Sequence, residues 1–246
     1  MIKTHLFIQL TLIPLLLLLS SKSSAQYSVE GLDVRNPHKW YDNQIGYDHS
    51  GILQGEYREI VFFTKNSDQF FNSPVWEANT ISFRNEVYDS IFMLYDIDED
   101  VLMIRHPTDV SYFGMGITLP QSDISWFTLS GHYFKNYSDP ILNLGKGFFE
   151  ESYLGDKMSL IIKRSKSLKT DRVLEFEDTH AYVIKLDESY HRFTGKSTFY
   201  RILPEYKKEI KQFLKDRRIN LRMKDSEEGL LKTIKYCDLL LAQSSK

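Results

Sequence analysis

Residues 75–105 carry the pattern that decides the fold, VWEANTISFRNEVYDSIFMLYDIDEDVLMIR. Short apolar segments are interrupted here by two polar breaks, one at Arg84-Asn85-Glu86 and one at residues 96–100. Strand-length apolar runs separated by a few polar residues are typical of β-hairpins. The stretch therefore predicts two successive hairpins of an antiparallel sheet.

The same rhythm extends along most of the chain. Further strand-length segments recur at about the 8 to 12 residue spacing of an antiparallel sandwich or barrel. They are residues 57–63, 116–119, 124–129, 148–154, 158–164, 172–176, 180–186 and 197–202. No helix-length amphipathic run separates them, which argues against a parallel α/β sheet with crossover helices. We expect a mainly β protein, either an antiparallel β-sandwich or a barrel-like meander.

The pattern changes at Pro204, a residue suited to the first turn of a helix. Apolar residues then recur at helical spacing in two stripes, Tyr206, Ile210, Phe213 and Leu214, followed by Leu230, Ile234, Cys237 and Leu241. Asp225 and Glu228 have the spacing of a capping pair for the second helix. We expect a helical appendix of two α-helices at 204–246, packed on a β domain at 26–203 whose first residues, to about 49, form an irregular lead-in.

The first 25 residues have the pattern of a secretory signal peptide. Lys3 precedes an apolar span at residues 6–19, and the small residues Ser23 and Ala25 precede the expected cut after Ala25. The span is shorter than the roughly 20 residues that a transmembrane helix needs. We expect a periplasmic or extracellular mature chain without a transmembrane segment.

Charge and cysteine content exclude several classes of protein. Removal of Lys3 and Lys22 leaves 29 basic against 33 acidic residues, a net charge near −4, which does not favour binding to nucleic acid. The single cysteine, Cys237, excludes an intrachain disulfide, a multi-cysteine zinc site and lipidation just after the apolar span. Its place on a helical stripe predicts a buried thiol.

Three segments carry a recognisable resemblance: residues 80–96 (TISFRNEVYDSIFMLYD), 148–155 (FFEESYLG) and 206–213 (YKKEIKQF). In these segments the chain resembles a group of secreted β-rich proteins of Bacteroidetes bacteria that has no assigned function. The resemblance spans residues 57–241. It implies a bacterial envelope setting and an antiparallel β fold, and it assigns no catalytic residue.

Two charged segments invite a functional interpretation. The acidic run at 96–100 begins like a calcium loop, but Val101 and Pro107 stand where an EF-hand requires Gly and Glu, so we expect a solvated hairpin turn. The basic run at 163–169 lies between two predicted strands, where a solvated hairpin end is expected and contact with an anionic surface is the alternative. The glycine pairs Gly114/Gly116 and Gly145/Gly147 lack a phosphate-loop pattern and predict turns.

No catalytic motif is present among the histidines, serines and carboxylates. The histidines that remain after processing, His38, His49, His106, His132, His180 and His191, show no HExxH spacing, and no serine lies in a G-x-S-x-G context. Glu150-Glu151 and Asp187-Glu188 lie on β segments. Since neighbouring strand residues point to opposite faces, neither pair by itself forms a glycosidase dyad.

Aromatic residues are the one compositional excess, at 14% of the chain, with Trp40, Trp76 and Trp126 spread along it. Most fit a core, and the remainder would suit the wall of a binding site. We therefore expect a non-enzymatic domain that binds a small ligand or an envelope protein, with no catalytic, cofactor-binding or metal residue assigned. The alternatives are a hydrolase with a loop-built site that uses His132 or His106, and a structural component of an outer-membrane assembly.

Overall fold

The computed structural model describes residues 51–61, 64, 67–106, 114–170, 173–221 and 227–244. The chain divides into two compact units, 1–35 and 36–246, and every described residue belongs to the second. The expected signal peptide, the lead-in at 26–49, Trp40 and Asp225 lie outside the described residues. No described helix combines the length and the apolar character that crossing a membrane requires.

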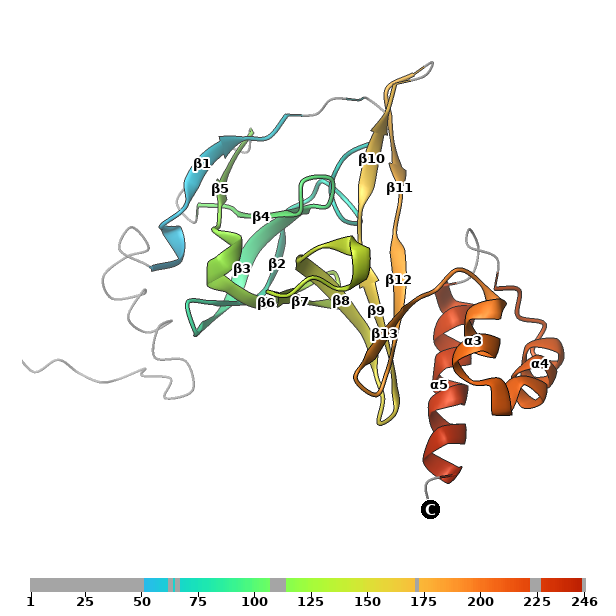
Figure 1. Ribbon diagram of the computed structural model, residues 1–246. Helices are drawn as coiled ribbons and strands as arrows, with labels where there is room; N and C mark the ends of the chain where they lie inside the picture. Colours follow the sequence, from blue (N-terminus) through green and yellow to red (C-terminus); the bar gives the residue numbers. More distant parts are fainter. Residues whose placement is uncertain are drawn as a thin grey trace, which may run out of the picture. The chain divides into compact units, whose positions relative to one another are not determined.

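Eleven antiparallel strands form one sheet (Figure 1). They are β1 (Glu56–Glu59), β2 (Glu77–Phe83), β3 (Glu86–Asp96), β4 (Val101–Ile104), β5 (Met115–Thr118), β6 (Ile124–Leu129), β7 (His132–Tyr137), β8 (Gly147–Leu154), β9 (Met158–Lys163), β12 (Ala181–Leu186) and β13 (Ser189–Arg192). Their order is β1-β5-β4-β3-β2-β6-β7-β8-β9-β12-β13, and β10 (Lys166–Lys169) and β11 (Glu175–Asp178) pair in a second, two-stranded sheet. The predicted mainly β, antiparallel class is confirmed.

The first predicted hairpin joins β2 to β3 at Arg84 and Asn85. Both residues have positive φ, 50° and 65°, which is the backbone of the two-residue turn that best matches the twist of paired strands. The second hairpin joins β3 to β4 through the predicted acidic run. Both breaks in the sequence pattern therefore mark real turns.

The large sheet curls around an aromatic core. The Tyr95 ring of β3 packs edge-on against Phe127 of β6, Phe134 of β7 and Phe148 of β8, with centroids 5.2–5.7 Å apart. Tyr95 thus contacts three strands, β6, β7 and β8, although β8 is the fourth strand along the sheet from β3. The two end strands, β1 and β13, do not pair with each other. The sheet is therefore curled but open, and because β1 pairs with β5 and β2 with β6 it is not a simple meander.

Three strands, β7, β10 and β13, fall outside the predicted segments. KSLK and SYHR are largely polar or charged, and in HYFKNY polar residues interrupt the aromatic ones, so none of the three is a continuous apolar run. Each is held in place by a neighbour with a stronger pattern, because β7 pairs with β6 and β8, β10 with β11, and β13 with β12. Backbone pairing compensates for a weak local preference.

Three α-helices follow the sheet in the described part of the chain, α3 (Lys196–Ile202), α4 (Lys207–Asp216) and α5 (Glu227–Ser244), with a 3-10 turn at Pro204–Tyr206. The predicted strand at 197–202 is wrong, since these residues form α3 and raise the number of helices from two to three. The Thr198 hydroxyl accepts a hydrogen bond from the backbone N–H of Thr194, and Phe199 is buried against Phe193. This tertiary packing outweighs the β preference of Thr, Phe, Tyr and Ile.

The helices cover β9 and β12 and form a second core. Cys237 of α5 is fully buried in it, as its stripe predicts, and burial raises the pKa of its thiol to about 12. The next residue, Asp238, accepts hydrogen bonds from the backbone N–H groups of Lys157 and Met158 and from the Tyr153 hydroxyl. One carboxylate thus fastens α5 to the turn between β8 and β9.

Candidate functional site

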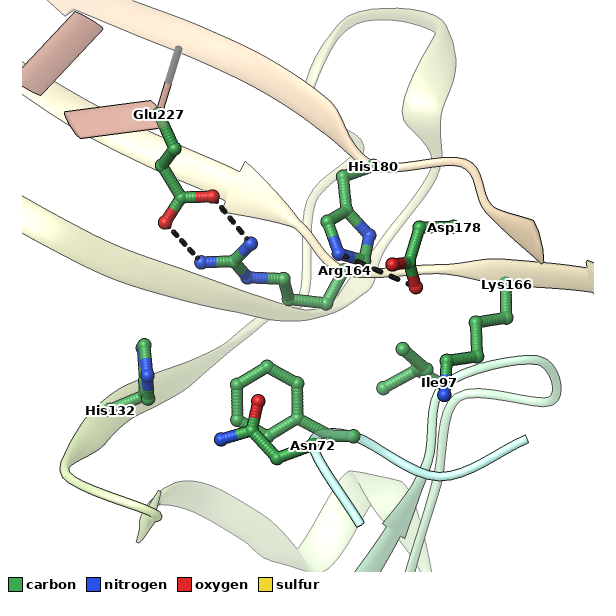
Figure 2. A pocket seen from close by; sticks show the side chains of 9 residues that line it. Asn72, Ile97, His132, Arg164, Lys166, Asp178, His180 and Glu227 are labelled. Carbon is green, nitrogen blue, oxygen red and sulfur yellow. Dashed lines mark hydrogen bonds and ion pairs between the residues drawn. The ribbon is translucent and has the colours of Figure 1, made fainter. Parts of the chain in front are cut away.

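A cleft of about 320 Å³ lies beside the curled sheet (Figure 2). Its lining residues come from segments far apart in the sequence: Phe71, Asn72, Ile97, His132, Arg164, Lys166, Asp178, His180 and Glu227. Six of the nine are titratable. The volume is near the lower end of the roughly 300–1,000 Å³ range of small-molecule sites.

Arg164, the first residue after β9, is the centre of a buried ion network. Its Nε lies 2.5 Å from Glu150 Oε2, and its two terminal nitrogens lie 2.7 Å from the two oxygens of Glu227. The Arg164 side chain is only 6% exposed and that of Glu150 only 4%. Tyr182 donates a further hydrogen bond to Glu227, at 3.1 Å. The network joins β8, β9, β12 and the first residue of α5 beneath the cleft.

The network keeps its groups ionised although Arg164 and Glu150 are buried and Glu227 is partly buried. Burial acts to raise the pKa of Glu150, but the hydrogen bonds from His132 and Arg164 outweigh it and hold the pKa below its ordinary value. Burial also acts to raise the pKa of Glu227, and the hydrogen bonds and charge of Arg164 outweigh it and lower this pKa. Burial acts to lower the pKa of Arg164, and its two carboxylate partners raise it instead. The site therefore contains fixed charges at neutral pH.

His132 begins β7 and faces the cleft above this network. Its Nδ1 lies 2.8 Å from Glu150 Oε1, and its ring packs edge-on against Phe71, with centroids 5.1 Å apart. A carboxylate at Nδ1 keeps the proton of the neutral ring on that atom and leaves Nε2 as an acceptor. Among the described residues, no hydrogen bond involves His132 Nε2.

His180 faces the cleft from the side of the small sheet. Its Nδ1 lies 3.0 Å from the carbonyl oxygen of Ser165, and its Nε2 lies 3.8 Å from Asp178 Oδ1. Burial and the nearby Arg164 charge lower the pKa of the imidazole, and Asp178 opposes them only in part. His180 is therefore neutral at neutral pH.

Lys166 of β10 fixes the loop that carries the remaining wall of the cleft. Its ammonium donates to the carbonyl oxygens of Phe70, at 2.6 Å, and Asp68, at 3.0 Å. Phe71 is further held by a hydrogen bond from its N–H to the carbonyl of Tyr95. The next residue, Asn72, is exposed and has a φ of 59°, a left-handed conformation that Asn adopts more readily than most residues.

The basic run at 163–169 is not the solvated hairpin end expected from the sequence. Lys163 ends β9 and pairs with Asp100 at 2.6 Å, Arg164 is buried, and Lys166 is mostly buried under its loop. The hairpin tip lies beyond this run, after β10. These cations point inward because carboxylates and backbone carbonyls from distant segments bind them. The local sequence does not reveal such partners.

The acidic run at 96–100 forms the predicted turn, but it is not fully solvated. Asp96 is 4% exposed, its Oδ1 accepts the backbone N–H groups of Asp98 and Glu99, and burial raises its pKa to about 6. Asp100 accepts hydrogen bonds from Tyr95 and Gln121 besides its ion pair with Lys163. In the described ranges, no three His, Cys, Asp or Glu side chains are grouped so that they would hold a metal ion.

The structure separates the other residues that the sequence singled out. Glu150 and Glu151 point to opposite faces, as expected, since Glu151 contacts Tyr137 and Lys135 and not the cleft. His106 stacks against Tyr57, away from His132. Gly114, Gly145 and Gly147 have positive φ and lie in turns or at strand ends, as predicted, whereas the turn prediction is wrong for Gly116, which lies in β5.

Sequence reasoning missed Arg164, Glu227, Phe71 and Asn72 as residues of one site. The available signal was weak: Arg164 follows the apolar β9 segment directly, where a charged residue at the end of a buried strand needs a partner. His132 and Glu150 were both noticed, but for separate reasons. Comparisons of the chain with models of protein families, with curated proteins and with solved structures found no match.

Proposed function

We propose that this protein binds a small polar molecule in the cleft between the curled sheet and the β10–β11 hairpin, without catalysing its conversion. The observation that supports the proposal is the combination of a 320 Å³ cleft with a buried ion network that holds His132 in one orientation. Rigid polar groups at the base of a concave site provide orientation and specificity for a ligand. The proposal includes secretion of the chain after a cut behind Ala25.

The test uses the mature chain, residues 26–246, and a screen of small polar compounds by saturation-transfer NMR. We expect hits whose signals are reduced by Asp178→Ala, which removes an exposed carboxylate from the cleft wall. Glu175→Ala is the matched control, because Glu175 is also exposed on β11 and does not line the cleft. Hits that respond equally to both variants, or no hits, would refute the proposal. Intact-mass analysis of the chain exported from cells tests the cut.

A hydrolase is the second candidate, and the Glu150–His132 pair at 2.8 Å is the observation that favours it. A carboxylate that orients an imidazole is a common arrangement for a general base. However, no described serine, threonine or cysteine donates to His132, and Cys237 is buried in the helical core. Water would have to be the nucleophile. Turnover of chromogenic esters or glycosides that disappears in His132→Ala would favour this candidate over simple binding.

A further inference from the structure

The cleft has four basic residues in its wall, His132, Arg164, Lys166 and His180, and at first sight it resembles an anion site. The hydrogen bonds of the two permanent cations contradict this. Each nitrogen of Arg164 donates to a carboxylate, and the Lys166 ammonium donates to two backbone carbonyls. A bound anion would have to displace these partners. The permanent cations of the cleft are therefore already engaged by the protein itself.

The groups that remain available in the cleft are acceptors. His132 Nε2 has no hydrogen-bond partner among the described residues, and in the tautomer that donates from Nδ1 to Glu150 this nitrogen is an acceptor. The Asp178 side chain is 65% exposed, and its Oδ1 lies 3.8 Å from Nε2 of His180, whose imidazole is neutral at neutral pH. Glu227 is partly exposed at the edge of the cleft. Figure 2 shows Glu227 and Asp178 on either side of Arg164, with His132 below.

The charge balance points the same way. Four carboxylates, on Asp68, Glu150, Asp178 and Glu227, surround the cleft or its immediate support, against two permanent cations, Arg164 and Lys166. With the two imidazoles left out of the count, the surroundings carry two excess negative charges. The Phe71 ring adds an aromatic wall, and aromatic rings attract cations.

We infer that the ligand of this cleft is a small organic cation that carries a primary ammonium group, an inference that rests on the proposed binding function. An ammonium has three donors and no acceptor, so it complements the imidazole nitrogen and the Asp178 carboxylate. A neutral alcohol satisfies the same acceptors without the charge attraction, and a carboxylate is repelled. The interaction is partly exposed to solvent and weakens with added salt.

Three probes with one four-carbon scaffold separate these cases: 1,4-diaminobutane, 1,4-butanediol and succinate. The protein is the ¹⁵N-labelled mature chain at neutral pH, and binding is followed by the amide resonances of residues around the cleft. We expect the diamine to shift these resonances in a saturable manner and the diol and succinate to have little effect. Asp178→Asn, which keeps the shape of the side chain, should weaken diamine binding at least tenfold, whereas Glu175→Gln on the same strand should not.

Each other result overturns the inference. Equal binding of the diol means that charge is not recognised, and stronger binding of succinate means that the cleft is an anion site. Diamine binding that is unaffected by Asp178→Asn places the ammonium elsewhere. If the NMR screen yields cleft ligands but the diamine does not bind, the inference fails and the proposed function stands. If neither binds, both fail.

Discussion

Replacement of Arg164 by Met tests whether the ion network is the structural base of the cleft. Met approximates the length of the aliphatic part of Arg and removes the charge. The change leaves Glu150, 4% exposed, with His132 as its remaining partner, and leaves Glu227 without its guanidinium. Breaking a buried ion pair from one side typically costs about 3–5 kcal/mol. Since Glu150 retains one hydrogen bond, we expect a loss near the lower limit, about 3 kcal/mol at neutral pH.

The pH dependence of this stability loss is a more specific test of the same reasoning. In the wild type the pKa of Glu150 is lowered, so its contribution to stability is present above the unfolded pKa and is lost as the pH falls through the folded pKa. Without Arg164, burial dominates and raises the pKa of Glu150, so the ionised carboxylate then lowers the stability of the fold instead of raising it. The stability difference between wild type and variant should therefore shrink as the pH falls from neutral toward about 4.5, where the carboxyl of the unfolded chain titrates. Addition of Glu150→Gln to Arg164→Met should recover part of the loss, since it removes the unpaired charge.

Urea unfolding followed by tryptophan fluorescence measures these differences, because Trp76 and Trp126 lie in the described sheet region. For a domain of this size, a loss of about 3 kcal/mol is a large part of a total of roughly 5–15 kcal/mol. A loss below about 1 kcal/mol at neutral pH, the value of a surface pair, or a loss that does not change with pH, would refute the reasoning that removal of Arg164 leaves a buried charge without compensation.

Three further predictions concern single residues elsewhere. Asp96→Asn keeps the Oδ1 acceptor and removes a buried carboxyl whose pKa is raised to about 6. Because the pKa is raised, wild-type stability falls as the pH rises from about 4 to 6. The variant should therefore be more stable than the wild type at neutral pH by up to about 3 kcal/mol, and equally stable near pH 4. Urea unfolding midpoints measure both differences. Gly147→Ala should lower the melting temperature strongly, because φ is 116° and the added Cβ would lie 2.1 Å from Asp100 Oδ2. Gly131→Ala is the control, since Gly131 has a φ of 78° and nothing lies within 4 Å of the added Cβ. It should lower the melting temperature only by the cost of placing Ala in a left-handed backbone conformation. Cys237 should resist iodoacetamide in the native protein and react only in denaturant, since it is fully buried and its pKa is raised to about 12; rapid native alkylation followed by mass spectrometry would contradict this.

Local patterns predicted those elements whose cause is local. The turn at Arg84-Asn85 and the strand at 124–129 were predicted because apolar periodicity and turn chemistry act within a few residues. The helix after Pro204 follows from the same kind of signal. The segment 197–202 was mispredicted because its residues favour strands in isolation, while burial of Phe199 against Phe193 decides for a helix. Local preference is a weak term when packing opposes it.

The sequence by itself determined the mainly β class, the antiparallel hairpins, the helical end and the buried place of Cys237, because each depends on periodicity along the chain. Only the tertiary structure decided that Glu150, Arg164 and Glu227 meet, across separations of 14 and 63 residues, and that the basic run turns inward. Partners of a charged side chain are set by how the sheet curls and by where α5 docks. These are properties of the whole fold, so no short segment contains the information that places the charges of the cleft.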